Sequence, residues 1–180
     1  MTIETSQRQR QFVLVSGAPA AGKTTLARAL APLLAMSLIA KDDIKEALFD
    51  ALGGPPGDLA WSRKVGGAAM ETLWRLAERS AGAVLEANFR PHSAYERGRL
   101  EHLAAEIVEV NCWCPPEVLL RRFHERAKTA HPAHVLTDLS PEMVAEFDRP
   151  VAFGSVLQVD TSRPVDVPAI AAEVARLLGR

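Results

Sequence analysis

Hydrophobic and polar positions alternate along the chain in a pattern that predicts short buried strands separated by amphipathic helices. The apolar run at 12–16 is typical of a strand buried on both faces, and further strand candidates lie at 37–40, 83–87, 107–113 and 156–160. Helical spacing of apolar residues covers 23–31, 42–52, 59–79, 94–105, 116–128, 141–147 and 167–178. Because parallel strands need crossovers, the alternation predicts an α/β fold with a parallel sheet between two layers of helices.

Two details of these helices can be predicted more closely. We expect Pro32 to kink or end the first helix near Ala31, because proline disrupts a helix interior. For the helix at 42–52, the spacing predicts a buried face made of Ile44, Leu48 and Leu52.

Length, charge and cysteine content narrow the class of protein. The chain has 180 residues, a formal net charge of −1 and 48% hydrophobic residues, which fits one domain and argues against a nucleic-acid coat or a membrane-surface protein. We expect a flexible leader at 1–10 and a single domain at 11–180. The chain opens without a secretion signal and has no membrane-spanning run, so we expect a cytoplasmic location. Cys112 and Cys114 lack the spacing of a zinc site and are expected to be buried reduced thiols.

A phosphate-binding motif lies between the first strand and the first helix. Residues 17–24, Gly-Ala-Pro-Ala-Ala-Gly-Lys-Thr, fit G-x-x-x-x-G-K-[ST] in a strand–turn–helix context. The glycines allow the backbone to approach phosphates, Lys23 is expected to reach the terminal phosphates, and the Thr24 hydroxyl is expected to ligate Mg²⁺. We therefore expect ATP and Mg²⁺ as cofactors, with the nucleotide bound by Gly17, Ala18, Pro19, Ala20, Ala21, Gly22, Lys23, Thr24 and Thr25.

Two neighbouring carboxylates follow the second expected strand. Asp42 and Asp43 lie between Lys41 and Lys45. A carboxylate at this edge can orient an acceptor hydroxyl and take its proton, whereas Asp at the start of a helix is also a common N-cap. The pair allows both roles, because one Asp can cap the helix while its neighbour faces the reacting groups.

These segments resemble a family of small P-loop kinases grouped around polynucleotide 5′-kinase, zeta toxin and chloramphenicol phosphotransferase, which are AAA-type ATP-binding kinase-like proteins. The resemblance rests on 17–25, 41–45, 84–89 and the arginines at 121, 122 and 126, and it spans residues 12 to about 130. It implies a three-layer P-loop NTPase fold of the nucleoside-monophosphate-kinase type, with five parallel strands in the order 2-3-1-4-5. It also implies that Asp42 is the catalytic base and that Lys45 contacts the acceptor.

The resemblance further implies an arginine-bearing lid at about 118–140. Arg122 and Arg126 are four residues apart on one helical face, and we expect them to act with Lys23 on the charge of the transferred phosphate. The alternative is a solvated face on which these arginines pair with Glu117 and Glu125.

The ends of later strands supply the remaining candidates. Glu86 stands where relatives often carry Asp, so it either contacts Mg²⁺ through water or is a satisfied carboxylate beneath the phosphate loop. Asn88 and Arg90 at the strand tip are placed to touch the acceptor or a phosphate. In the place where relatives wrap adenine with a loop, Thr161 and Arg163 are the candidates for that contact.

The histidines after the arginine helix belong to no recognisable metal site. His124, His131 and His134 lack a neighbouring cluster of Cys or carboxylate ligands, and we interpret 131–134 as part of a lid or acceptor loop.

The leading hypothesis is an ATP- and Mg²⁺-dependent kinase that transfers the γ-phosphate to a hydroxyl of a small molecule, such as an antibiotic, a sugar or a nucleoside. The insertion at about 49–80 would shape the acceptor pocket, although its aromatic side chains are more typical of core. A polynucleotide 5′-hydroxyl kinase is an alternative that the net charge of −1 disfavours. A nucleotide-dependent switch or ATPase is a second alternative.

Overall fold

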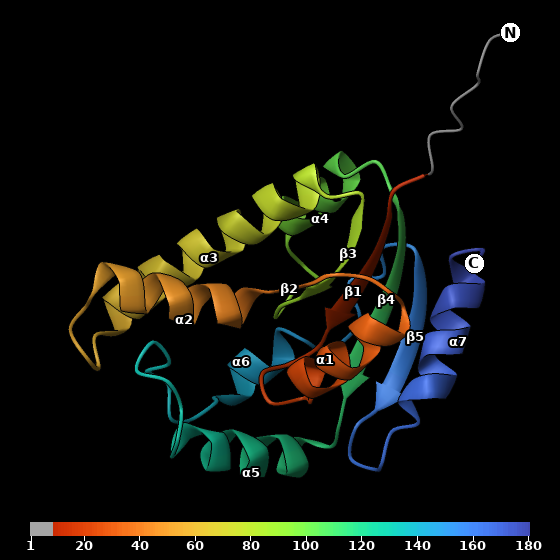
Figure 1. Cartoon of the computed structure of the whole chain (residues 1–180). Helices are drawn as coiled ribbons and strands as arrows, with labels where there is room; N and C mark the ends of the chain where they lie inside the picture. Colours follow the sequence, from red (N-terminus) through yellow and green to blue (C-terminus); the bar gives the residue numbers. More distant parts are fainter. Residues whose placement is uncertain (1–8) are drawn as a thin grey trace, which may run out of the picture.

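Five parallel strands form the centre of the molecule (Figure 1). They are β1 (Gln11–Ser16), β2 (Leu38–Ala40), β3 (Gly82–Glu86), β4 (Glu106–Trp113) and β5 (Ser155–Asp160), in the order β2-β3-β1-β4-β5. This computed structural model describes residues 9–180, so most of the expected leader at 1–10 lies outside the described residues. The strand order confirms the expected P-loop fold of the nucleoside-monophosphate-kinase type.

Helices cover both faces of the sheet, and alternate residues of β1 belong to different faces. Val13 and Val15 pack in a core cluster with α1 (Lys23–Leu33), α5 (Pro116–Ala127) and α7 (Val167–Leu177). Phe12 and Leu14 pack in a second cluster with α3 (Leu59–Arg79) and α4 (Ala94–His102). Burial on both faces explains why this strand reads as a continuous apolar run.

The two remaining helices lie beyond the carboxyl ends of the strands. Helix α2 (Lys41–Leu52) follows β2 directly and lies beside α3, and the two project together past the edge of the sheet (Figure 1). Helix α6 (Pro141–Ala145) lies between α5 and β5 in the chain. Of the aromatic side chains in the insertion, Trp74 is fully buried with its ring centroid 5.7 Å from that of Phe89, as a core residue would be.

The first helix ends two residues beyond Ala31, near which we expected Pro32 to kink or end it. Helix α1 continues through Pro32 to Leu33. The carbonyls of the last turn keep partners, because Leu34 N donates to Leu30 O at 3.1 Å and Met36 N donates to Ala31 O at 3.0 Å. A proline one residue from the end therefore removes a hydrogen bond without ending the helix at that point.

The expected buried face of α2 is wrong only in part. Leu52 is 62% exposed, whereas Ile44 and Leu48 are half-buried and pack against core clusters. The fully buried residues of the helix are Lys45 and Phe49, which lie against α3 and the loop after α5. Neither Asp42 nor Asp43 caps the helix, because both lie in its first turn and the N-cap residue is Ala40.

Two expectations from composition concern membrane spans and cysteines. Within residues 9–180, no helix combines the length and the apolar character needed to cross a bilayer. Cys112 and Cys114 are both buried and free, and burial raises the pKa of Cys112 to about 12, which keeps this thiol protonated.

Arg10 is anchored to the domain, although the sequence places it in the flexible leader. Its guanidinium donates hydrogen bonds at 2.6 to 3.1 Å to the carbonyl oxygens of Ala77, Glu78, Ser80 and Leu103. These oxygens lie at the ends of α3 and α4, so Arg10 ties the start of β1 to both helices. The ordered domain therefore includes residue 10.

We expect Arg10→Ala to lower the free energy of unfolding by about 2 kcal/mol, because it leaves buried helix-end carbonyls without a charged donor. Urea denaturation followed by circular dichroism measures this change. Arg75→Ala, which removes an exposed arginine from α3, is the matched control and should change stability by less than about 0.5 kcal/mol. Equal losses for the two variants would show that the Arg10 contacts add nothing net.

Candidate active site

The phosphate loop is shaped by two glycines at the carboxyl end of β1. Gly17 has φ +126°, and a Cβ at this position would lie 2.1 Å from the Cys112 carbonyl oxygen on the neighbouring strand β4. Gly22 has φ +85° and is the N-cap residue of α1, where no side chain caps the helix. Both positions need glycine. The uncapped amides of the first turn remain free for phosphate oxygens.

Lys23 is a buried cation at the start of α1. The residue is 5% exposed, and its Nζ donates to the Ala18 carbonyl oxygen at 2.7 Å. Burial lowers the pKa of Lys23, while the carboxylates of Glu86 and Asp42 act in the opposite direction. One hydrogen bond leaves the other ammonium protons available for phosphate oxygens.

Glu86 at the end of β3 has a buried carboxylate oxygen that is suited to binding a metal ion. It is 3% exposed, and its Oε2 is buried without a hydrogen-bond partner among the described residues. Burial raises its pKa, and the Lys23 ammonium opposes that rise. An orphaned carboxylate oxygen beside the Thr24 hydroxyl is suited to Mg²⁺ or its water, since this ion prefers hard oxygen donors.

No group of three or more His, Cys, Asp or Glu side chains capable of holding a metal occurs in the described part of the chain. Mg²⁺ at this position would therefore complete its ligands with phosphate oxygens and water. Such sharing is usual for Mg²⁺ bound to a nucleotide, so Thr24 and Glu86 fit the ion as part of a nucleotide complex and not as a separate metal site.

Asp42 is an ionised carboxylate at the same edge of the sheet. Burial opposes its ionisation, but the Lys41 ammonium, 2.9 Å from Oδ1, together with His134 and Lys23, lowers the pKa of Asp42 to about 2. Its neighbour Asp43 pairs with Arg28 of α1 at 2.8 Å, and both side chains are largely exposed. The two acidic residues thus have different surroundings, and of the two Asp42 lines the cavity described below.

A cavity of about 530 Å³ brings most of the predicted site residues together. The predicted residues that line it are Ala20, Gly22, Lys23, Thr24, Thr25, Asp42, Glu86, Asn88, Arg122, Arg126, Thr161 and Arg163, most of them polar. Apolar side chains of α1 and of the segment after β5 complete it, namely Leu26, Ala29, Val165 and Val167. A polar end beside an apolar end suits a nucleotide, with phosphates over the loop and the base against the valines.

Arg122 and Arg126 enter this cavity from α5. Arg122 donates to the Thr161 carbonyl oxygen at 2.7 Å and to its Oγ1 at 3.2 Å. Arg126 lies over the Phe123 ring, with its guanidinium carbon 5.5 Å from the centroid. Neither arginine pairs with a carboxylate within the described residues, whereas Glu125 pairs with Lys128. This arrangement favours the cavity-facing alternative over the solvated face.

Thr161 joins the loop after β5 to the phosphate loop. The Thr161 Oγ1 donates to the Ala21 carbonyl oxygen at 2.8 Å. A Cβ added at Gly22 would lie 3.3 Å from the Thr161 Cβ, so the two residues are in close contact. The expected nucleotide-side position of Thr161 and Arg163 thus has a physical basis, since this contact holds the loop next to the start of α1. Contact with adenine stays a prediction.

Two predicted acceptor residues do not line the cavity. The Lys45 Nζ donates to the Ser62 Oγ at 2.8 Å in the buried contact between α2 and α3. Arg90 extends to the surface and pairs with Glu146 at 3.0 Å. Four residues of the phosphate loop, Gly17, Ala18, Pro19 and Ala21, also lie outside the lining and act through the loop's shape.

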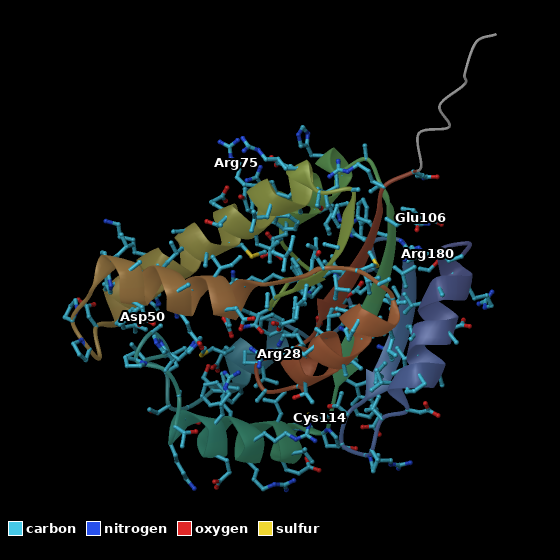
Figure 2. The ribbon with its side chains drawn as sticks, in the orientation of Figure 1. Arg28, Asp50, Arg75, Glu106, Cys114 and Arg180 are labelled. Atoms are coloured by element: carbon cyan, nitrogen blue, oxygen red, sulfur yellow. The ribbon has the colours of Figure 1, made fainter. Side chains whose placement is uncertain are left out.

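The loop at 128–140, which lies in the expected lid, docks on α2 and α3. The Ser62 Oγ donates to the Ala133 carbonyl oxygen at 2.7 Å, and the Ala133 side chain is fully buried in a small cluster with Phe49 and Val65. His131 and His134 pair with Asp50 and Glu46 of α2 at 3.1 and 2.9 Å. Figure 2 shows Asp50 at the end of α2 that is farther from the sheet. The loop at 128–140 is therefore fixed to α2 and α3 in this structure.

Sequence reasoning missed both Ser62 and Glu109. Glu109 is fully buried on β4 and accepts hydrogen bonds from the Ser16 Oγ and from the amides of Val151 and Ala152, the latter two at 2.9 and 2.8 Å. It thereby connects the residue before Gly17 to the segment before β5. A single serine on a helix and a glutamate inside a strand carry no motif, so the sequence offered no signal for either contact.

Comparisons with known proteins agree with this geometry. The model of the AAA domain family (AAA_33) matches residues 12–150. A solved structure from Chloroflexus aurantiacus J-10-fl, provisionally described as a kinase, is 30% identical in sequence. The alignment covers 94% of this chain and 98% of that chain, with a TM-score of 0.80. No curated protein matches the sequence.

More distant solved structures share the fold. An APS kinase from Mycobacterium tuberculosis, in complex with AMPPNP and APS, is 20% identical over 96% of this chain and 99% of that chain, with a TM-score of 0.59. A shikimate kinase from Acinetobacter baumannii, in complex with shikimate, is 20% identical over 96% of this chain and 94% of that chain, with a TM-score of 0.55.

We expect Gly17→Ala to weaken ATP binding at least about tenfold, because the new methyl group meets the Cys112 carbonyl oxygen and φ is left-handed. Isothermal titration calorimetry on protein shown to be folded by circular dichroism measures the affinity. Gly67→Ala on α3, where no atom lies within 4 Å of the new Cβ, should bind ATP normally and gain about 0.5–1 kcal/mol of stability. Normal ATP binding by Gly17→Ala would refute the shape requirement.

We expect Ser62→Ala to release the lid, because it removes the donor to the Ala133 carbonyl and the acceptor of the Lys45 ammonium. Trypsin cleavage after Lys128 should become about tenfold faster, as expected when a local opening costs about 1.4 kcal/mol less. Thr72→Ala is the control, since the Thr72 hydroxyl bonds only to Ala68 O of its own helix. Mass spectrometry of a digestion time course gives both rates, and equal rates would contradict the lock.

Proposed function

The chain belongs to the AAA domain family, and on that premise we propose that it is a kinase that transfers the γ-phosphate of ATP to a hydroxyl group of a small molecule. The observation that carries the proposal is the placement of the ionised Asp42 carboxylate in the same cavity as Lys23 of the phosphate loop. The 30% identical protein from Chloroflexus aurantiacus, provisionally described as a kinase, supports this assignment.

The proposed reaction needs positioning and charge stabilisation more than covalent chemistry. The acceptor hydroxyl oxygen forms a bond to the γ-phosphorus while the bond from that phosphorus to the bridging oxygen breaks, and ADP leaves with the electron pair. Asp42 accepts the hydroxyl proton and later releases it to water. A carboxylate with a pKa of about 2 is a weak base, so Asp42 acts first by orienting the hydroxyl, and it takes the proton as the new bond makes the oxygen acidic.

The charge of the transferred group is met by cationic side chains from two helices. Lys23 approaches from the start of α1, and Arg122 and Arg126 approach from α5. Thr24 and Glu86 would hold Mg²⁺, which when bound neutralises part of the negative charge of the triphosphate. Because these donors lie in a cavity with buried walls, each is worth more than it would be in bulk water.

We further propose that the acceptor is a small molecule and not a nucleic-acid 5′-end. The net charge is −1, and the segment at 128–140 docks over α2 and α3 by way of Ser62 and Ala133. A strand-binding groove usually carries an excess of basic and aromatic side chains, whereas here the exposed arginines are offset by acidic partners such as Glu146 and Glu173.

We expect Asp42→Asn to lower kcat at least about 100-fold and to change the affinity for ATP less than about twofold, because the amide can neither accept the proton nor attract the hydroxyl. Transfer from radiolabelled ATP to a panel of alcohols, sugars, aminoglycosides, amphenicols, nucleosides and 5′-hydroxyl oligonucleotides provides the assay. Asp43→Asn, which alters the exposed neighbour, should retain activity.

Three outcomes would each overturn a different part of the proposal. Transfer by Asp42→Asn at the wild-type rate would remove Asp42 from the reaction. Transfer to oligonucleotides alone would favour the polynucleotide kinase. Hydrolysis of ATP at a rate that no acceptor changes would favour a switch or ATPase.

A further inference from the structure

We propose that Glu109, a buried residue of β4, is a positioning residue of the phosphate loop. Its carboxylate acts through the Ser16 hydroxyl and fixes the point at which the loop leaves β1, so that the loop amides are aligned for the phosphates of the nucleotide. The inference rests on the proposed function only in so far as the loop binds nucleotide phosphates. It adds a residue outside the loop on which that binding depends.

Glu109 places a carboxylate on an otherwise apolar part of the sheet. It is fully buried and stands opposite Leu14 of β1, which belongs to the core cluster under α3 and α4. None of the ion pairs among the described residues includes Glu109. Burying a carboxylate without a cation is costly, and an apolar side chain would fill such a position at a lower cost. Packing alone therefore does not account for this residue.

Three donors meet the Glu109 carboxylate. The Ser16 hydroxyl donates to Oε1, the Val151 amide donates to Oε1 at 2.9 Å, and the Ala152 amide donates to Oε2 at 2.8 Å. Both carboxylate oxygens thus have partners, and the group acts as an acceptor only. These hydrogen bonds replace those lost from water, which explains how the carboxylate is tolerated in the core.

The Ser16 hydroxyl is held from two sides. Ser16 is the last residue of β1, directly before Gly17, and it is 1% exposed. Its Oγ donates to Glu109 and accepts from the Asn111 Nδ2 at 2.9 Å. Asn111 is the β4 residue opposite Ser16 in the sheet, so both partners belong to one strand. The side chain is therefore fixed in one orientation, and with it the backbone that leads into Gly17.

Side chains thus anchor the phosphate loop at both ends. At its far end, the Thr161 Oγ1 donates to the Ala21 carbonyl oxygen at 2.8 Å. At its near end, the Glu109–Ser16 contact holds the residue before Gly17. A loop that binds phosphates with backbone amides depends on their direction, because N–H hydrogen bonds weaken steeply as they bend. Loss of the near anchor should therefore weaken binding of the phosphates more than binding of the base.

The other two donors to Glu109 come from a segment that β4 already holds closely. Ala152 has φ +55°, in the left-handed region that residues other than glycine seldom adopt. Gly154 has φ +83°, and a Cβ there would lie 2.0 Å from the Ile107 carbonyl oxygen of β4. Glu109 thus ties the phosphate loop to closely packed backbone. Such a rigid support is what a positioning residue requires.

The test separates binding of the phosphates from binding of the base. Isothermal titration calorimetry gives the dissociation constants of ADP and AMPPNP with Mg²⁺, and saturation-transfer NMR gives that of the more weakly bound adenosine. The readout is the ratio of the adenosine constant to the AMPPNP constant. A residue that merely stabilises the fold would not change this ratio in folded protein.

We expect Glu109→Met to weaken ADP and AMPPNP about tenfold and adenosine less than about twofold, because the Ser16 hydroxyl loses its acceptor. Removal of a negative charge by itself favours an anionic ligand, so weaker binding of the phosphates cannot arise from the change in charge. Ser16→Ala should have the same selective effect without leaving the backbone amides unpaired. It therefore also decides the question if Glu109→Met fails to fold.

Two further variants show whether Glu109 acts through Ser16. The double variant should bind AMPPNP no more weakly than Glu109→Met, because both changes remove one contact. Glu109→Gln should keep most of the affinity, since its amide oxygen can still accept from Ser16 while its amide group faces the Ala152 amide. We expect Glu109→Gln to be less stable than the wild type in urea and yet to bind phosphates well.

The matched control changes the same segment without touching Glu109. The Arg97 Nη2 donates to the Val151 carbonyl oxygen at 3.2 Å, and the guanidinium carbon lies 5.9 Å from the centroid of the Phe153 ring. Arg97→Met removes both contacts. It should lower the free energy of unfolding and leave all three dissociation constants within about twofold of the wild type.

The outcomes separate this inference from the proposed function. Normal binding of AMPPNP by Ser16→Ala, equal weakening of all three ligands, additive losses in the double variant, or an equal loss in Arg97→Met would each overturn the positioning role. Binding of AMPPNP by the wild type without transfer to any acceptor would refute the kinase and leave that role standing, because no acceptor enters the measurement. Wild-type protein that binds neither ADP nor AMPPNP would overturn both.

Discussion

The burial of opposite charges at the carboxyl edge of the sheet is the constraint on which the rest of the site depends. Lys23 and Glu86 are both almost fully buried. Lys23 lies at the start of α1, which follows β1 in the chain, and Glu86 lies at the end of β3, which pairs with β1 in the sheet. Each stabilises the charged form of the other, but burial still acts against both. Among the described residues, the Glu86 Oε2 has no hydrogen-bond partner, and Lys23 has spare ammonium protons, so this edge is incompletely satisfied. A charged ligand that supplied these partners would offset the cost of burying both groups.

A second set of contacts couples two segments that border the cavity. The loop at 128–140 continues α5, which carries Arg122 and Arg126, and Ser62 of α3 fixes this loop beside α2, which carries Asp42. Because Ser62 also accepts from Lys45 of α2, one hydroxyl connects the loop, α3 and α2. In the proposed kinase, this buried chain of hydrogen bonds would link enclosure of the cavity to the acceptor side.

The sequence predicts the strands and the phosphate loop well because both have strong local causes, whereas the strand order follows from the resemblance to small P-loop kinases. Apolar runs identify buried strands, and the fixed spacing from Gly17 to Thr24 reflects one backbone geometry. The buried face of α2 was predicted only in part, because it includes the Lys45–Ser62 contact, which hydrophobic periodicity cannot detect. Lys45 and Arg90 do not line the cavity because each is bound to a residue that is distant in sequence. Lys45 bonds to Ser62, and Arg90 pairs with Glu146. Side-chain direction at such positions depends on tertiary partners that one sequence does not reveal.

The low pKa of Asp42 depends on the position of Lys41. In this structure Lys41 is the principal group that outweighs burial and holds the Asp42 pKa at about 2. When the Lys41 ammonium moves away from Asp42, less of the cost of burial is offset and the pKa of the carboxylate rises. The strength of Asp42 as a base is therefore set largely by this one ion pair.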